Sequence, residues 1–364
     1  EPRPLAAGRR RIKKVIILSR VTAGADIAIT SVMVHRLAKS LPWAELILIG
    51  PGHLAAMFPE LDLRSLPFVY KNDGQLVDKV TSWLSLYEMV RREIQGDAAG
   101  SILLFDPDTR MTQLGLLPLA ADSSTCYFPS RVWQSRAGSH ANLSVLTNNW
   151  LNIILGETEE ETPYLILHSE GHGYNAFCQQ LRARGVFVIA VNLGVGNDCR
   201  KRISGSFEER LLFKLAREPH TMLILDSGRG EEEMREMRYL FERARQHGIQ
   251  TASLGEEQIP LARIKFNHGL VSFRGSLEAL GCLIGAADCF IGYDSCGQHL
   301  AAATGAPAVI IFAGAPSRRF IEHWSPAADK MKIITTDSRQ ANTEEGCAQL
   351  IAKVKKFINL VKTS

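Results

Sequence analysis

Short runs of four to six apolar residues, rich in valine, isoleucine and leucine, recur along the chain and constrain its fold most strongly. In the first third they lie at residues 15–18, 46–49 and 102–105. A strand covered on both faces of a parallel sheet reads as such a continuous run, whereas a half-exposed strand alternates polar and apolar residues. The runs therefore predict parallel strands buried on both sides.

The segment between the first two runs has the period of an amphipathic helix. Ile27, Val34, Leu37 and Leu41 share one face at 3.6 residues per turn, and Pro42 ends the helix. Strand, helix and strand in this order make a βαβ unit. The sequence therefore predicts an α/β fold built on a doubly wound sheet.

The second half of the chain repeats this alternation. Further apolar runs lie at residues 187–192, 221–225, 269–273, 289–292 and 308–312. An acidic segment closed by a proline, residues 156–163, separates the two series, as is typical of a connection between packed units. We therefore predict two Rossmann-like domains, residues 1–160 and 161–342, that face each other across a cleft, followed by a helix at 343–364.

The composition excludes several classes of protein. Of the 364 residues, 46% are hydrophobic and 22% are charged, which excludes a disordered or collagen-like chain. The net charge of +4 is too small to indicate nucleic-acid binding. The seven cysteines form no C-x-x-C pair, so neither a disulfide framework nor a zinc ribbon is predicted. We expect a cytoplasmic protein, since no apolar stretch approaches the roughly 18 residues of a membrane span.

Ligands of doubly wound sheets bind beyond the carboxyl ends of the strands, so the loops there are candidate sites. The first is residues 294–299, with the sequence DSCGQH, a polar turn that opens an alanine-rich helix. The N–H groups of a helix start can bind phosphate, Ser295 adds a hydroxyl donor, and Gly297 allows close approach. The spacing leaves an alternative equally open, in which Asp294 and Ser295 cap the helix and His299 is an interior residue.

The second loop follows another buried strand. It contains Asn192 and Gly194, and the cations Arg200, Lys201 and Arg202 come soon after. Three cations could neutralise a diphosphate. A charge run is more often a solvated face, and we favour that interpretation for Arg200 and Arg202.

The third loop follows the first strand and places Asp26 at the start of the next helix. A carboxylate there can serve as a general base toward a hydroxyl group. Aspartate is also a favoured N-cap residue, and position alone favours capping.

Several of these segments share a pattern with a known family. Residues 276–303 are similar to the pattern s-L-x-x-L-…-A-D-…-D-[ST]-G-x-x-H-L-A-A-A, with the order and spacing from Asp294 to His299 preserved. Shorter similarities are Gly305-Ala306-Pro307, Phe312-Ala313-Gly314-Ala315-Pro316, Asn192-Leu193-Gly194 with Lys201-Arg202, and the segment that begins Gly24-Ala25-Asp26. Over most of its length the chain thus resembles glycosyltransferase family 9, the bacterial ADP-heptose:lipopolysaccharide heptosyltransferases, which have the GT-B fold.

This resemblance implies an inverting glycosyltransferase. The N-terminal domain would bind the acceptor and the C-terminal domain the nucleotide sugar. Asp26 would remove a proton from the acceptor hydroxyl as it attacks the anomeric carbon. Lys201 would stabilise the charge on the departing nucleoside diphosphate, a task that needs no metal when cations and a helix dipole perform it.

The resemblance also implies a donor site and partners. The expected donor-binding residues are Asn192, Gly194, Asp294, Ser295, Cys296, Gly297 and His299. The expected donor is a nucleotide-diphosphate sugar, with ADP-heptose first, and no other cofactor or metal is expected. A lipid-linked glycan would be the acceptor, which implies peripheral contact with the inner face of the cytoplasmic membrane.

The chain departs from the family pattern at three places. Ala25 is inserted into the usual Gly-Asp pair, Cys296 replaces a glycine, and Ile203-Ser204 replaces Trp-Pro. These departures leave the fold prediction unchanged. They open the alternative of a catalytically silent member that holds a nucleotide or a glycan, while a GT-B-related epimerase agrees less well with the N-terminal similarity.

The last helix admits two interpretations. Lys353, Lys355, Lys356 and Lys362 make it basic, with apolar residues between them, which suits contact with an anionic membrane. Alternatively it packs its apolar face back on the N-terminal domain. We favour packing.

Overall fold

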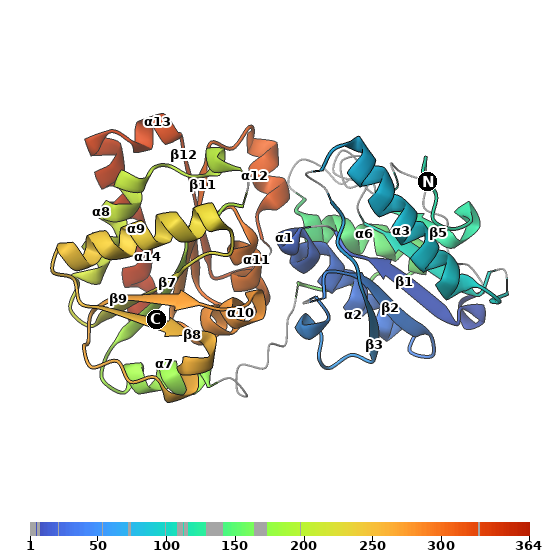
Figure 1. Cartoon of the computed structure of the whole chain (residues 1–364), viewed down its shortest axis with the longest axis horizontal. Coiled ribbons are helices and arrows are strands. Elements are labelled where there is room, and N and C mark those ends of the chain that lie inside the picture. The colour runs from blue at the N-terminus through green and yellow to red at the C-terminus, as the bar shows by residue number, and fades with distance from the viewer. Residues whose placement is uncertain are drawn as a thin grey trace. The chain divides into compact units, whose positions relative to one another are not determined.

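The structure is a computed structural model that describes residues 5, 8–20, 22–52, 54–71, 74–98, 100–107, 112, 116–128, 141–163, 173–196, 198–326 and 328–364. The chain divides into two compact units (Figure 1). Unit 1 comprises Glu1–Ile166 and Glu322–Ala327, and unit 2 comprises Leu167–Ile321 and Ala328–Ser364.

Unit 1 is built on a five-stranded parallel sheet in the order β3-β2-β1-β4-β5. The strands are β1 (Lys14–Leu18), β2 (Glu45–Gly50), β3 (Leu63–Pro67), β4 (Ile102–Asp106) and β5 (Thr125–Tyr127). The helices are α1 (Ala23–Ala25), α2 (Ser31–Ser40), α3 (Leu76–Ile94) and α6 (Leu143–Leu155), with a π-helical turn at Asp26–Thr30. Short 3-10 turns lie at Arg9–Arg11, Ala55–Met57 and Asp122–Ser124.

Helices cover both faces of this sheet because alternate strand residues point to opposite sides. Ile16 and Leu18 belong to a core cluster with Leu86 of α3. On the other face Phe105 of β4 meets Trp150 of α6, edge to face, at 5.7 Å between ring centroids. The four apolar residues predicted to form one helix face are all fully buried, so that prediction is confirmed.

Unit 2 contains a seven-stranded parallel sheet in the order β12-β11-β10-β6-β7-β9-β8. The strands are β6 (Phe187–Asn192), β7 (Thr221–Asp226), β8 (Thr251–Gly255), β9 (Gly269–Arg274), β10 (Cys289–Tyr293), β11 (Ala308–Ala313) and β12 (Met331–Thr336). The helices are α7 (Tyr174–Arg182), α8 (Gly205–Ala216), α9 (Glu231–Gln246), α10 (Leu277–Ala286), α11 (Cys296–Ala303), α12 (Arg318–Trp324), α13 (Ser338–Ala341) and α14 (Glu344–Thr363). Turns of 3-10 helix lie at Cys199–Lys201 and Glu256–Leu261.

The last helix, α14, packs within unit 2. Cys347, Leu350, Val354 and Ile358 follow one another at helical spacing and join the core cluster of that unit. Lys362 also donates a hydrogen bond of 3.0 Å to the hydroxyl of Thr221. The apolar stripe of this helix therefore packs in the core of unit 2, and packing on the N-terminal domain stays a prediction.

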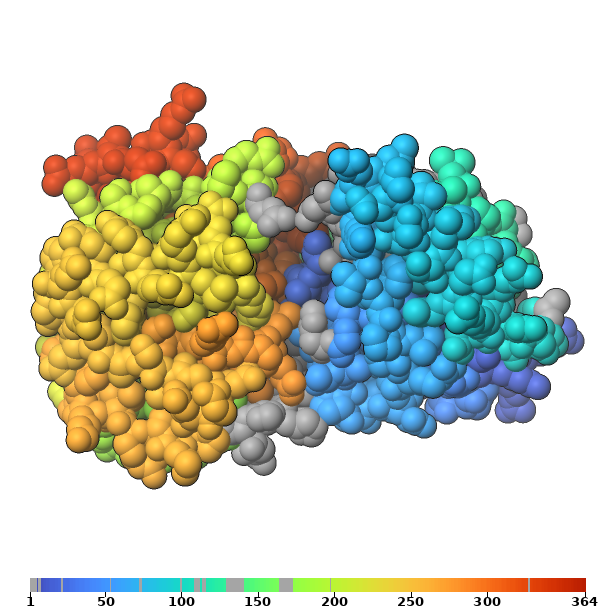
Figure 2. Space-filling model, in the orientation of Figure 1, coloured from blue at the N-terminus to red at the C-terminus, as the bar shows by residue number. Residues whose placement is uncertain are grey.

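The helix α3 forms part of the outer surface of unit 1 visible in Figure 2. Its buried residues are Ser82, Leu86 and Val90, which recur every four residues. Among the described residues, no helix is both long enough and apolar enough to cross a membrane.

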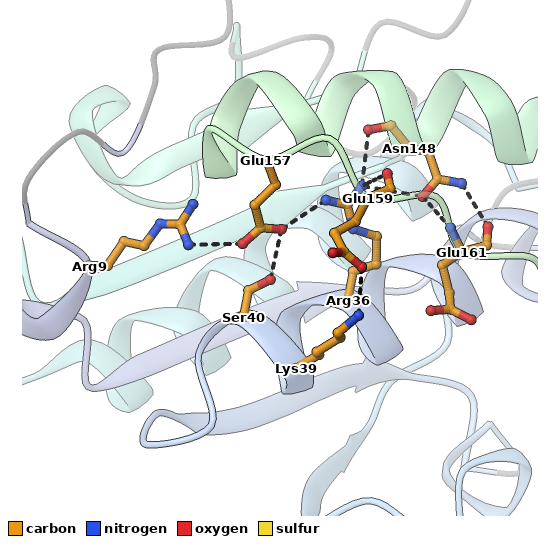
Figure 3. Close-up of polar contacts among 8 residues, drawn as sticks. All are labelled: Arg9, Arg36, Lys39, Ser40, Asn148, Glu157, Glu159 and Glu161. Carbon is orange, nitrogen blue, oxygen red and sulfur yellow. Dashed lines mark hydrogen bonds and ion pairs between the residues drawn. The ribbon is translucent and has the colours of Figure 1, made fainter.

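The acidic segment after α6, predicted to separate the domains, is tied down at its start by a buried arginine (Figure 3). Arg36 of α2 is 2% exposed and pairs with the carboxylate of Glu157 at 2.9 Å. Its guanidinium also donates to the backbone carbonyls of Asn148 (3.2 Å) and Glu159 (3.1 Å). The Asn148 side chain in turn holds the backbone N–H of Glu161 at 2.9 Å. The first residues of this segment are therefore a packed part of unit 1.

We predict that Arg36→Met lowers the free energy of unfolding of unit 1 by about 3 kcal/mol, because it leaves the polar partners of a buried cation unpaired. All five tryptophans fall in the ranges of unit 1, so urea unfolding followed by tryptophan fluorescence reports on this unit. Lys39→Met is the matched control, since the Lys39 ion pair with Glu159 lies at the surface. Equal effects of the two substitutions would contradict the structural role of Arg36.

Candidate functional site

The carboxyl edge of the sheet in unit 2 gathers most of the residues predicted to bind a donor. From β6 the chain continues to β7 on one side, and it returns later to β10 on the other side. Ligands of doubly wound sheets bind at such a switch point. Asn192 is the last residue of β6, and Asp294 directly follows β10. These two residues therefore flank the switch point.

Side-chain hydrogen bonds join the ends of three strands at this edge. The Asn192 amide donates to the Asp226 carboxylate at the end of β7 (2.7 Å), and its amide oxygen accepts from the Ser295 hydroxyl (3.3 Å). Asn192 and Asp226 are buried, whereas Ser295 is half-buried. The network fixes the loop that leads into α11.

The start of α11 is not capped as the alternative interpretation supposes. Ser295 occupies the N-cap position, but its side chain accepts no hydrogen bond from the helix. The Asp294 carboxylate instead accepts from the side-chain amide of Gln298 at 2.7 Å. Neither side chain caps the helix, so the first turn keeps the backbone donors that suit an anion.

Lys201 is brought to the same turn from the second loop. Its ammonium lies 2.9 Å from the Asp294 carboxylate and 3.3 Å from the Asp294 backbone carbonyl. The ammonium is also 5.7 Å from the centre of the Phe320 ring. A side chain that is about a quarter exposed is thus held in one position beside α11.

His299 lies on the inner side of α11 and is 5% exposed. Burial lowers the pKa of its imidazole to about 3, and the positive charge of Lys201 adds to this effect. The ring is therefore neutral at physiological pH. A neutral buried ring can shape the pocket but supplies no positive charge to a diphosphate.

The two neighbouring positions at the start of α11 differ in how much space they have. A Cβ atom on Gly297 would lie 2.7 Å from Cζ of Phe290, so packing already requires a glycine there. Cys296 is half-buried, and burial raises the pKa of its thiol to about 11. The thiol therefore stays protonated at neutral pH and is not a reactive nucleophile.

Gly194 lets the side chain of Glu233 lie close against the backbone, a contact that sequence reasoning did not anticipate. A Cβ atom there would lie 1.5 Å from a carboxylate oxygen of Glu233, in the first turn of α9. The same carboxylate accepts a hydrogen bond from the backbone N–H of Arg229 at 2.9 Å. Arg229 in turn pairs with Asp226 at 3.6 Å.

Three charged residues at this edge were thus missed: Asp226, Arg229 and Glu233. Glu233 lies in the acidic first turn of α9, where negative charge is favourable at any helix start, so its position in the sequence indicates no function. The available signal was positional, since Asp226 ends a buried strand as Asn192 does.

The other two cations of the second loop, Arg200 and Arg202, differ in how exposed they are and in their ion-pair partners. Arg200 has an 82% exposed side chain paired with Asp198, in agreement with a solvated face. Arg202 has a 15% exposed side chain that pairs with Glu236 and, at 2.5 Å, with the fully buried Glu208. The solvated interpretation is wrong for Arg202, because a buried carboxylate on α8 requires a cation.

In unit 1, Asp26 lies beyond β1, next to the switch point between β1 and β4. Its carboxylate accepts hydrogen bonds from the Ser19 hydroxyl (2.8 Å), the Arg20 backbone N–H (2.6 Å) and the Thr30 hydroxyl (2.8 Å). The N-cap of α1 is Thr22. Asp26 therefore does not cap this helix, and the capping alternative is wrong.

A π-helical turn follows from Asp26 to Thr30, in which the N–H of Ser31 bonds to the carbonyl of Asp26 five residues earlier. A π turn takes up one residue more than an α turn, and such turns are frequent at functional sites. The inserted Ala25 is adjacent to this turn, which can absorb the extra residue without displacing Asp26 from the edge of the sheet.

Burial raises the pKa of Asp26 from 3.8 to about 6, although the hydrogen bonds from Arg20, Thr30 and Ser19 oppose the shift. The carboxyl is 2% exposed. It is mostly ionised at neutral pH, yet it holds a proton more readily than an ordinary aspartate. These are the properties of a general base.

Two α/β units, each built on a parallel doubly wound sheet, are the architecture of the GT-B fold. Residues 239–352 match the model of glycosyltransferase family 9 (heptosyltransferase). This region is therefore similar to family 9 glycosyltransferases, in agreement with the predicted resemblance, and the two units have the GT-B fold.

Solved structures agree on the fold. The family 9 glycosyl transferase from Veillonella parvula is 13% identical, with 97% of this chain and 98% of that chain covered and a TM-score of 0.63. E. coli ADP-heptose lps heptosyltransferase II is also 13% identical, with 96% and 99% covered and a TM-score of 0.60. E. coli heptosyltransferase WaaC with ADP-2-deoxy-2-fluoro heptose is 13% identical, with 93% and 99% covered and a TM-score of 0.56. No curated protein matches the sequence.

In the described part of the chain, no three His, Cys, Asp or Glu residues are grouped so that they could hold a metal ion. The roles of Asp26 and Lys201, and the independence of metal, remain predictions.

We predict that the wild type gains on the order of 2–3 kcal/mol in stability relative to Asp26→Asn between pH 7 and pH 4. Because the folded pKa of about 6 lies above the ordinary value, protonation favours the folded state, and this contribution is lost as pH rises through 6. Urea unfolding by tryptophan fluorescence at several pH values measures the difference. Asp62→Asn, at an exposed loop carboxylate, is the matched control. A difference independent of pH would contradict the raised pKa.

Proposed function

We propose that the chain is an inverting, metal-independent glycosyltransferase that moves a sugar, with heptose as the first candidate, from a nucleotide-diphosphate donor to a lipopolysaccharide-core or other cell-surface glycan. The observation that carries this proposal is the meeting of Lys201 with the uncapped start of α11. A cation and a row of backbone donors suit a diphosphate, and the backbone donors lie within the region that the family model matches.

On the donor side, these groups would act on the leaving group. Negative charge develops on the diphosphate as its bond to the anomeric carbon breaks. Lys201 is already oriented by Asp294, so it can stabilise this charge with little reorganisation. Asn192 would hold the Ser295 loop in place through its hydrogen bond, and His299 would shape the pocket as a neutral ring.

On the acceptor side, Asp26 would be the general base. It would accept the proton of the acceptor hydroxyl as the oxygen attacks the anomeric carbon from the face opposite the leaving group, which inverts the configuration. A pKa of about 6 leaves the carboxylate ionised at neutral pH and still able to accept a proton. The Ser19, Thr30 and Arg20 donors would keep its orientation fixed during transfer.

The finer substrate assignment follows the relatives. The structures similar in fold include a heptosyltransferase described with ADP and one described as an ADP-heptose lps heptosyltransferase. We propose ADP-heptose as the donor, a lipid-linked glycan as the acceptor and a cytoplasmic location at the inner membrane surface.

One observation favours a second candidate, a catalytically silent protein that binds a nucleotide or a glycan. Cys296 places a half-buried side chain at the first position of α11, where the family has a glycine that lets phosphate approach. Nucleotide binding without sugar transfer or donor hydrolysis would support this candidate.

We predict that Asp26→Asn lowers the rate of sugar transfer by at least about a hundredfold, since general-base catalysis typically contributes this much. The affinity for ADP should not change. In the wild type, the rate should rise with pH through an apparent pKa near 6, and this limb should vanish in the variant. Transfer of radiolabelled sugar to a glycan acceptor measures both effects, with Asp62→Asn as the control. Unchanged turnover would remove Asp26 from the mechanism.

We predict that Lys201→Ala weakens ADP binding by about tenfold or more, because a hydrogen bond to a charged group typically contributes about 1.5–3 kcal/mol. Calorimetry measures the affinity, and a thermal-shift panel of ADP, UDP, GDP and CDP identifies the base. Arg200→Ala is the matched control, since it removes an exposed neighbouring cation. Equal affinity of wild type and Lys201→Ala would show that the loop does not hold the diphosphate.

A further inference from the structure

The outer face of α3 carries an apolar stripe that nothing in the described chain covers. Leu76, Val77, Val80 and Leu84 are 76%, 74%, 44% and 49% exposed. Residues 76, 80 and 84 follow one another at single helical turns, so they line one side of the helix. Leu86 and Val90 lie on a neighbouring side of the helix, and this side packs on the sheet. The helix thus has two apolar faces and uses only one for folding.

Aromatic and aliphatic side chains extend this stripe at its edge. Trp83 and Tyr87 stack on each other at 5.4 Å between centroids, and both are half-buried. The Trp83 indole N–H donates to the carbonyl of Leu117 at 3.0 Å, which brings this loop beside α3. Leu116 next to it is 82% exposed. We call Leu76, Val77, Val80, Leu84 and Leu116 the α3 patch; α3 faces the viewer in Figures 1 and 2.

Cations lie at the carboxyl end of the same helix. Arg91 and Arg92 are exposed, and Arg91 falls on the side of the stripe, seven residues after Leu84. Within the described residues, no acidic side chain forms an ion pair with either arginine, although Glu88 is one turn away. An apolar stripe with tryptophan and tyrosine at its edge and arginine at its end is the chemistry of a helix that lies in a membrane interface.

We propose that the α3 patch docks unit 1 on an anionic lipid surface. The inference builds on the proposed function, because a lipid-linked acceptor is met at a membrane. The stripe from Leu76 to Leu84 is only about 12 Å long. A stable protein interface buries about 800 Å² on each partner, whereas a membrane needs only a few inserted side chains aided by attraction between cations and lipid headgroups.

The competing surface for such contact is α14, and the structure argues against it. The apolar stripe of α14 is packed in the core of unit 2 and is not available for another contact. Two of its lysines are also engaged, since Lys355 pairs with Glu218 at 2.6 Å and Lys362 lies 3.8 Å from the same carboxylate. Leu360 is exposed by 60% but stands alone on this helix.

Flotation with vesicles of phosphatidylcholine, with and without phosphatidylglycerol, tests the proposal. The triple variant Leu76→Gln, Val80→Gln, Leu84→Gln should reduce the vesicle-bound fraction of the full chain at least about tenfold, because it removes the inserted apolar surface. The double variant Arg91→Gln, Arg92→Gln should reduce binding by about tenfold on phosphatidylglycerol vesicles only. Leu360→Gln is the matched control and should float as the wild type does.

Any other outcome of these experiments contradicts the proposed contact with lipid. If the wild type does not float, or the triple variant floats equally well, the patch is not a membrane contact. If light scattering shows a wild-type dimer that the triple variant loses, and the wild type does not float, the patch pairs with a second copy. Circular dichroism of each variant verifies folding. The assay uses no donor or acceptor, so failure of flotation and failure of sugar transfer are distinguishable.

Discussion

Parallel strand pairing is the constraint on which the rest of this structure depends. Because all strands of a unit run in the same direction, every loop that leaves a strand emerges at one edge of the sheet. In unit 2 this brings Asn192, Asp226 and Asp294 together, although more than a hundred positions separate the first from the last. Hydrogen bonds at this edge then fix the loop before α11 and orient Lys201. The common direction of the strands therefore determines which residues meet at this edge, and those residues determine its chemistry.

Burial shifts the pKa values of two candidate groups in opposite directions: it raises the pKa of Asp26 and lowers the pKa of His299. Asp26 is surrounded by three hydrogen-bond donors, yet burial still raises its pKa, so the carboxylate keeps some affinity for a proton. His299 is buried beside a cation, which keeps its ring neutral. The local environment, and not the residue type, therefore sets the protonation of both groups.

The sequence predicted the interior of each sheet well and its borders poorly. The eight predicted apolar runs correspond to β1, β2, β4, β6, β7, β9, β10 and β11. The missed strands β3, β5, β8 and β12 are the edges of the two sheets, where half-exposed residues replace the continuous apolar run. The same limit applies to the site. Motifs indicated Asn192, Lys201 and Asp294, whereas Arg229 and Glu233 reach the edge from a loop and a helix whose positions no local pattern encodes.

Amphipathic patterns show that a helix has an apolar face, but not what that face contacts. The basic residues of α14 suggested a membrane contact, yet its single apolar face fills the core of unit 2. In α3 the buried set of Ser82, Leu86 and Val90 already accounts for its packing, so the stripe through Leu76, Val80 and Leu84 is additional. Keeping such side chains in water is unfavourable and adds nothing to folding. Packing within unit 1 accounts for the buried side of α3, and the exposed stripe is the side that the proposed lipid contact would cover.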